Sequence, residues 1–148
     1  MATIDKTIGE GFGTGKLYDI LKWQNGVPCD AEFTIGSESS DTISVNVQFL
    51  DWNGDPLTNP TGILAYVSTS ADGCSVDGIG SNGQSLAISS GGDGTLLELV
   101  NKKLYWLVPS SSGTIDIDFS DTGDATYYLV LVLPNGKLAI SDAITFTA

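Results

Sequence analysis

Apolar and polar residues alternate through most of the chain, from Asp41 to the last residue. In the clearest run the odd positions are all apolar: Ile43, Val45, Val47 and Phe49. Successive side chains of a β-strand point to opposite faces, so a period of two predicts strands with one buried and one exposed face. The chain is therefore expected to be all-β, an antiparallel β-sandwich for the most part.

Ten segments have strand character, and Gly, Ser, Asn and Asp are concentrated between them, which is typical of short strands joined by tight turns. The segments are Ala31–Ile35, Thr42–Asp51, Gly62–Ser70, Gln84–Ile88, Leu96–Val100, Lys103–Val108, Thr114–Phe119, Thr126–Leu133, Lys137–Ile140 and Ala143–Thr147. Residues 71–94 are the loosest part, and we expect their loops to project outward.

One strand segment, Thr126–Leu133, is apolar on both faces. A strand of this kind needs cover on both faces. The sandwich core supplies one cover, and the other is expected from the N-terminal segment or from a partner. Leu129 and Leu131 are expected on the outward face.

Residues 1–38 differ from the rest and are predicted to be an N-terminal extension, with the sandwich at residues 39–148. A helix of two or three turns is expected around Lys16–Gln24, ended by Gly26–Pro28. Its candidate docking residues are Leu17, Ile20, Leu21 and Trp23. A helix this short must dock on something, and it either caps one end of the sandwich or packs on a neighbouring subunit.

The charge and composition exclude several classes of function. The chain has 18 acidic residues, six lysines, no arginine and no histidine, for a formal net charge of −12. Nucleic acids and anionic membranes attract basic proteins, so neither is expected as a partner. Without histidine or arginine the usual general base, catalytic triad and phosphate clamp are missing, so we expect no enzyme and no cofactor.

One acidic pair could still act on a glycosidic bond. Asp116 and Asp118 lie on one face of a predicted strand, and two carboxylates can hydrolyse a glycoside. The favoured interpretation is a solvated acidic face opposite Ile115 and Ile117.

The segment Asp51–Asp55 places acids and an amide at alternate positions, like the first half of a calcium loop. The twelfth position of such a loop needs an acid, and here it is Gly62, so we expect a turn and no metal site. Cys29 and Cys74 are the two cysteines. No secretory signal opens the chain, so two free thiols and synthesis in the cytoplasm are expected. No apolar run approaches the length that spans a bilayer.

Three stretches carry family resemblances. The stretch Val45–Leu57 resembles the strand–turn signature of bacterial immunoglobulin-like domains, which implies an immunoglobulin-like sandwich. The pattern Asp121-x-Gly123-x-Ala125-x-Tyr127 is similar to the sequence in which a tyrosine forms a corner before a strand of that fold. The stretches 123–138 and 143–146 resemble small virion proteins of tailed bacteriophages, over roughly residues 40–148.

The resemblance to virion proteins implies a non-enzymatic structural protein that decorates or cements the capsid surface. Its implied partner is the major capsid protein or another virion protein, with a homo-oligomer on the particle as a further option. The implied location is the virion, on the capsid surface rather than the tail. The alternative is an adhesive or carbohydrate-binding module of a tail or cell surface.

Overall fold

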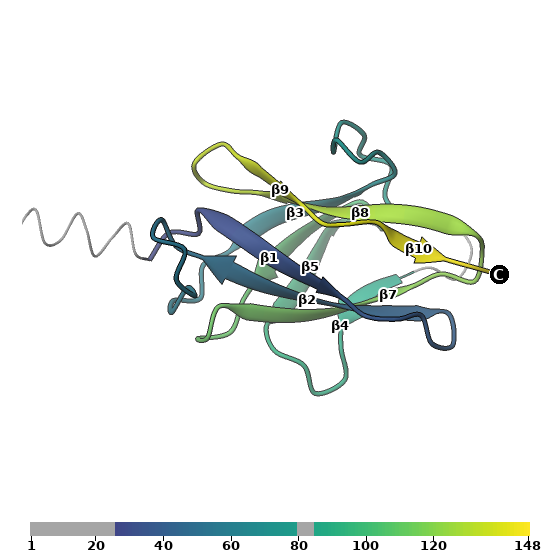
Figure 1. Ribbon diagram of the computed structural model, residues 1–148, viewed down its shortest axis with the longest axis horizontal. Coiled ribbons are helices and arrows are strands. Elements are labelled where there is room, and N and C mark those ends of the chain that lie inside the picture. Colours follow the sequence, from purple (N-terminus) through teal and green to yellow (C-terminus); the bar gives the residue numbers. More distant parts are fainter. Residues whose placement is uncertain (1–25, 80–84) are drawn as a thin grey trace, which may run out of the picture.

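The computed structural model describes residues 26–79 and 85–148, which form an immunoglobulin-like antiparallel β-sandwich (Figure 1). All ten strands predicted from the sequence are present. They are β1 (Asp30–Ile35), β2 (Thr42–Leu50), β3 (Ile63–Ser68), β4 (Ser85–Ile88), β5 (Thr95–Val100), β6 (Leu104–Val108), β7 (Thr114–Ser120), β8 (Ala125–Val132), β9 (Leu138–Ile140) and β10 (Ile144–Phe146). No helix in the described ranges is long and apolar enough to cross a membrane.

The first sheet has the strand order β1-β2-β7-β4. Its alternation is as predicted: Val45 pairs with Ile117 and Val47 with Ile115, and all four side chains are fully buried. Strand β1 lies within the predicted extension, residues 1–38, and pairs along its whole length with β2. The sandwich thus includes residues on the N-terminal side of residue 39.

The second sheet has the order β10-β8-β3-β6-β5, with β9 also paired to β8. Both β9 and β10 lie along the same side of β8, and the register shifts by one residue between them. At the shift the Leu129 N–H donates to the hydroxyl of Ser141 at 2.9 Å, so a side chain replaces a backbone acceptor. A second register shift lies in β5, between Glu98 and Val100.

The segment Asp51–Asp55 is a turn, as predicted. The Asp51 N–H donates to the Asp55 carbonyl at 2.9 Å, and Gly54 has a φ of 83°, which glycine adopts without strain. The Asp51 carboxylate accepts hydrogen bonds from the N–H groups of Asn53 and Asp55. That carboxylate therefore organises the turn itself.

The resemblance to a tyrosine corner has a structural counterpart. The Tyr127 hydroxyl donates to the Asp121 carboxylate at 2.5 Å, and both residues are buried. The other Asp121 oxygen accepts from the Gly123 N–H at 2.9 Å. The acceptor is a side chain here, whereas the corner in antibody-type domains closes on the backbone.

The expected orientation of β8 is wrong. Leu129 and Leu131 face the core and are fully buried, while Val130 and Val132 lie on the outer face of the sheet. The reason is register, because Leu131 pairs with the core residue Ala65 of β3, which fixes the faces of the whole strand.

Candidate functional site

A row of apolar side chains crosses the outer face of the second sheet. Strand register places them side by side, one from each of five neighbouring strands. We call this set the apolar row, in order from β5 to β9: Leu97, Trp106, Leu64, Val132 and Leu138. Neighbouring strands lie about 4.8 Å apart, so the row is about 19 Å long.

Three members of the apolar row are exposed to solvent, and the other two, Leu64 and Val132, are half-buried. Leu97 is 58% exposed, and Trp106 and Leu138 are each 40% exposed. The indole of Trp106 lies over the backbone of Gly62, where a Cβ would come within 2.3 Å of its Nε1 atom. Because Gly62 has no side chain, the indole ring of Trp106 can lie against the sheet.

The next row on the same face is covered. It consists of Leu104, Tyr66, Val130 and Ile140, from β6, β3, β8 and β9, and ends at Val100 of β5, which is 49% exposed. The loop Thr69–Ile79 lies over it, and the Tyr66 hydroxyl donates to the Gly73 carbonyl at 2.6 Å in a buried hydrogen bond. In Figure 1 this loop rises above the layer of β3 and β8.

This covering loop corrects two expectations. The second cover of β8 comes at Val130 from the chain's own loop, since a Cβ on Gly73 would lie 3.4 Å from Val130 and 3.1 Å from Ile140. The same loop was expected to project outward, and instead it returns to the sheet, where the Gly78 N–H donates to the Val67 carbonyl. Val132, two residues along β8 on the same face, is half-buried, whereas Val130 is fully buried.

Short polar contacts hold the covering loop in shape. The Ser68 hydroxyl accepts from the Ser70 N–H and lies 3.0 Å from the Ser75 hydroxyl. The Asp72 carboxylate accepts from the Ser70 hydroxyl, and this hydrogen bond lowers the pKa of Asp72. These hydrogen bonds lie within residues 68–75 and hold the shape of the loop, which suits a loop that permanently covers the neighbouring row.

The outer face of the first sheet is polar instead. The Asp116 carboxylate accepts from the Asn46 amide at 2.6 Å and from the Asp93 N–H at 2.9 Å. The Asp118 carboxylate accepts from the hydroxyls of Ser44 at 2.6 Å and Ser89 at 2.7 Å. The hydrogen bonds that Asp116 accepts from the Asp93 N–H and from Asn46 lower its pKa, which favours the charged form.

These contacts bear on the glycosidase alternative. A general acid needs a carboxyl group whose pKa is raised, and the shift at Asp116 is in the opposite direction. Both carboxylates are engaged by strand neighbours or by the turn at residues 89–93. The arrangement is that of the solvated acidic face expected from the sequence.

Tyr105 has a buried hydroxyl for which the described residues offer no hydrogen-bond partner. Burial, with a smaller effect of the nearby Glu98 carboxylate, raises the pKa of Tyr105 to about 12. The hydroxyl therefore stays protonated at physiological pH and does not suit acid–base chemistry.

The predicted docking residues Leu17, Ile20, Leu21 and Trp23 lie outside the described residues. The structure does show where the chain emerges from that segment. The Gly26 carbonyl accepts from the Thr61 hydroxyl at 3.2 Å, one residue before the Gly62 that supports Trp106.

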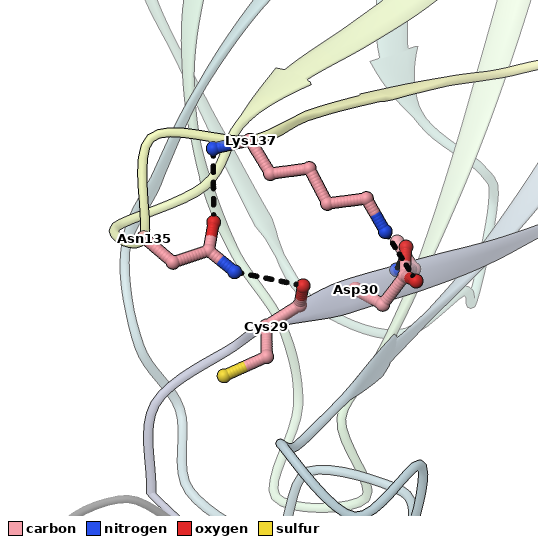
Figure 2. Close-up of polar contacts among 5 residues, drawn as sticks. Cys29, Asp30, Asn135 and Lys137 are labelled. Atoms are coloured by element: carbon pink, nitrogen blue, oxygen red, sulfur yellow. Dashed lines mark hydrogen bonds and ion pairs between the residues drawn. The ribbon is translucent and has the colours of Figure 1, made fainter.

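Two polar contacts fix the chain just after that point (Figure 2). The Asn135 amide donates to the Cys29 carbonyl at 3.1 Å. Lys137 forms an ion pair with Asp30 at 2.7 Å, and its hydrogen bond lowers the pKa of Asp30. Because Lys137 directly precedes Leu138, the N-terminal segment leaves the sandwich beside the apolar row.

Two further expectations from the sequence concern metal ligands and cysteines. Within residues 26–79 and 85–148, no group of three or more Cys, Asp or Glu side chains is placed to hold a metal ion. Cys29 and Cys74 are free thiols, on the N-terminal side of β1 and in the covering loop.

No protein-family model and no curated protein matches the sequence. Among solved structures, the chain is similar to a cohesin module from a family 33 glycoside hydrolase of Clostridium perfringens. The identity is 10% and the TM-score 0.45, over 82% of this chain and 98% of that one. It is also similar to the GAE domain of GGA2p from Saccharomyces cerevisiae, at 11% identity and a TM-score of 0.29, over 78% and 87% of the two chains.

Likenesses this weak carry no argument about function. The virion role stays a prediction.

Proposed function

We propose that this chain is a non-enzymatic docking module that attaches to a protein partner through the apolar row. The single observation behind the proposal is that one row of the second sheet is covered by the chain's own loop while the adjacent row is left open. A continuous apolar strip on a soluble protein is typical of an interaction site. It offers apolar area without any group suited to catalysis.

The proposed partner is a virion lattice, with the chain decorating or cementing the capsid surface. The resemblance of residues 40–148 to small virion proteins supports this role. The charge supports it as well, because free copies that carry −12 repel one another and stay dispersed until they dock. The proposed location is the capsid surface of the virion, and the proposed site of synthesis is the host cytoplasm.

The alternative is an adhesive or carbohydrate-binding module. A sugar-binding site is expected to have several aromatic rings in a concave patch. The apolar row has four aliphatic residues and one aromatic, Trp106, on a strand face. The composition of the row therefore favours a protein surface over a sugar.

The test measures the occupancy of purified particles by the full chain and by two surface variants. Leu97→Asp places a charge in the apolar row, and we expect it to lower occupancy about tenfold or more, since burying a leucine contributes about 1.5–3 kcal/mol. Val76→Asp is the matched control, because Val76 is 51% exposed and lies outside the row. Equal occupancy by both variants would contradict docking through the row, and particles that never contain the chain would contradict the virion role.

A further inference from the structure

The N-terminal segment leaves the sandwich next to the apolar row. Gly26 is hydrogen-bonded to Thr61, and Trp106 lies over Gly62. Trp23 is three residues before Gly26, a distance that the chain spans with at most about 10 Å. Leu17 is nine residues before Gly26, a separation of at most about 30 Å, so the chain is long enough to bring residues 17–23 to the row.

The dimensions of the segment also match those of the row. The seven residues from Leu17 to Trp23 span about 9 Å as a helix and about 20 Å when extended. The row is about 19 Å long. The segment can thus contact Trp106 and at least one neighbour on either side of it.

Charge favours this segment over a second copy of the sandwich. Residues 1–25 contain three acidic residues and three lysines and have no net charge, so the whole formal charge of −12 lies on residues 26–148. Two sandwiches that meet face to face would bring two such charges together. A neutral apolar segment on the same chain meets no such repulsion, and tethering gives it an effective concentration in the millimolar range.

We propose that residues 17–23 of the same chain lie on the apolar row and cover it until the partner displaces them. Leu17, Ile20, Leu21 and Trp23 supply the apolar contacts. This inference rests on the proposed docking role and adds its regulation. The apolar row has a removable cover, whereas the next row has a permanent cover, residues 69–79.

Limited digestion of the full chain with trypsin tests this cover. Trypsin cuts after lysine; Lys16 directly precedes the covering residues and Lys22 lies among them. Leu97→Asp is expected to speed cleavage after both lysines about tenfold, because proteolysis follows the population of the open form. Val76→Asp is expected to leave the rate unchanged.

Controls within the same digest exclude general unfolding. Cleavage after Lys102, Lys103 and Lys137 reports on the sandwich and is expected to stay slow in every variant. Protection of Lys16 and Lys22 is expected to be independent of protein concentration. Protection only in concentrated solution would mean that the segment docks on another copy, and it would overturn the proposal.

Leu21→Asp gives the reciprocal test. It is expected to speed cleavage after Lys16 and Lys22, and to shift the indole N–H resonance of Trp106 but not that of Trp52. Ile8→Asp, a similar change outside residues 17–23, is the control. Unchanged cleavage in both Leu97→Asp and Leu21→Asp would overturn the proposal.

Particle binding separates this proposal from the docking role. Releasing the cover raises the fraction of binding-competent chain, so Leu21→Asp is expected to dock more tightly, while Leu97→Asp docks more weakly. If Leu21→Asp lost docking, the segment itself would be the attachment device, and the cover would be refuted. If only Leu97→Asp lost docking and the digests did not differ, the docking role would stand without the cover.

Discussion

The outer faces of the two sheets differ in polarity. On the first sheet, carboxylates such as Asp116 and Asp118 accept hydrogen bonds from their strand neighbours. On the second sheet the corresponding positions are apolar, and one row is covered by the loop Thr69–Ile79 while the next is open. A polar face needs no partner, whereas the exposed apolar side chains beside a covered row are the reason we propose that this surface binds a partner.

The largest expected effect is a difference in unfolding free energy between variants at two neighbouring residues of β8, one in the core and one in the apolar row. Leu131→Ala removes a fully buried side chain and is expected to cost about 2–5 kcal/mol of unfolding free energy. Val132→Ala, its neighbour in the apolar row, is expected to cost about 1 kcal/mol or less because it is half-buried. Urea unfolding measures both, and equal costs would show that the described faces of β8 are wrong.

Removing the hydroxyl oxygen of Tyr66 should loosen the loop at residues 69–79 from the row that it covers. Tyr66→Phe deletes the buried hydrogen bond to the Gly73 carbonyl and is expected to cost about 1–1.5 kcal/mol. Hydrogen exchange of the Gly78 N–H, which is bonded to Val67, should become faster. Tyr128→Phe on β8 is the matched control and should cost less, since Tyr128 is only half-buried. An unchanged exchange rate at Gly78 would mean that the tyrosine does not hold the loop down.

On the polar face, Asp116→Asn should have a smaller effect that depends on pH. The pKa of Asp116 is lowered by the hydrogen bonds from the Asp93 N–H and from Asn46, so the charged form stabilises the fold. That stability is present above the ordinary aspartate pKa and is lost as the pH falls through the lowered value. We expect a cost of about 0.5–1 kcal/mol at neutral pH that disappears in acid. Asp142→Asn, at an exposed acid, is the control, and equal curves for both variants would contradict a special role for Asp116.

The smallest effect is expected at the ion pair beside the point where the chain emerges. Lys137→Ala breaks a contact whose side chains are about half exposed, and such surface pairs contribute about 0.5 kcal/mol or less. The pKa of Asp30 should rise toward its ordinary value, because the hydrogen bond from Lys137 is the main cause of its lowering. An NMR titration measures the pKa of Asp30, and urea unfolding measures the loss of stability. A loss above about 1 kcal/mol would show that this contact anchors the end of the sandwich.

The strands were predictable because each depends on a local pattern. Alternation at Ile43–Phe49 was enough to place its odd residues in the core, and the pair Asn53-Gly54 was enough to predict the turn. The Asp121–Tyr127 pattern likewise led to a real contact. In each case the signal lies within about ten residues of sequence.

The candidate site was not predictable because it depends on register between strands. Leu97, Trp106 and Leu138 come from three strands, and no local pattern indicates that they share one row. The faces of β8 could not be assigned for a similar reason, since Leu131 and Val132 are both apolar and only pairing with Ala65 separates them. The loop over Val130 was missed because its polar sequence resembles that of an ordinary exposed loop. The sequence did single out Leu17 and its neighbours as docking residues, but not the surface on which they would lie.

The register shifts of the second sheet have a further consequence. Its two borders are β5 on one side and β9 with β10 on the other, and each is interrupted, near Leu99 and at Ser141. A continuous border invites another chain to add a strand, and a bulge blocks such pairing after a few residues. The borders of the second sheet therefore disfavour edge-to-edge pairing between copies of the chain.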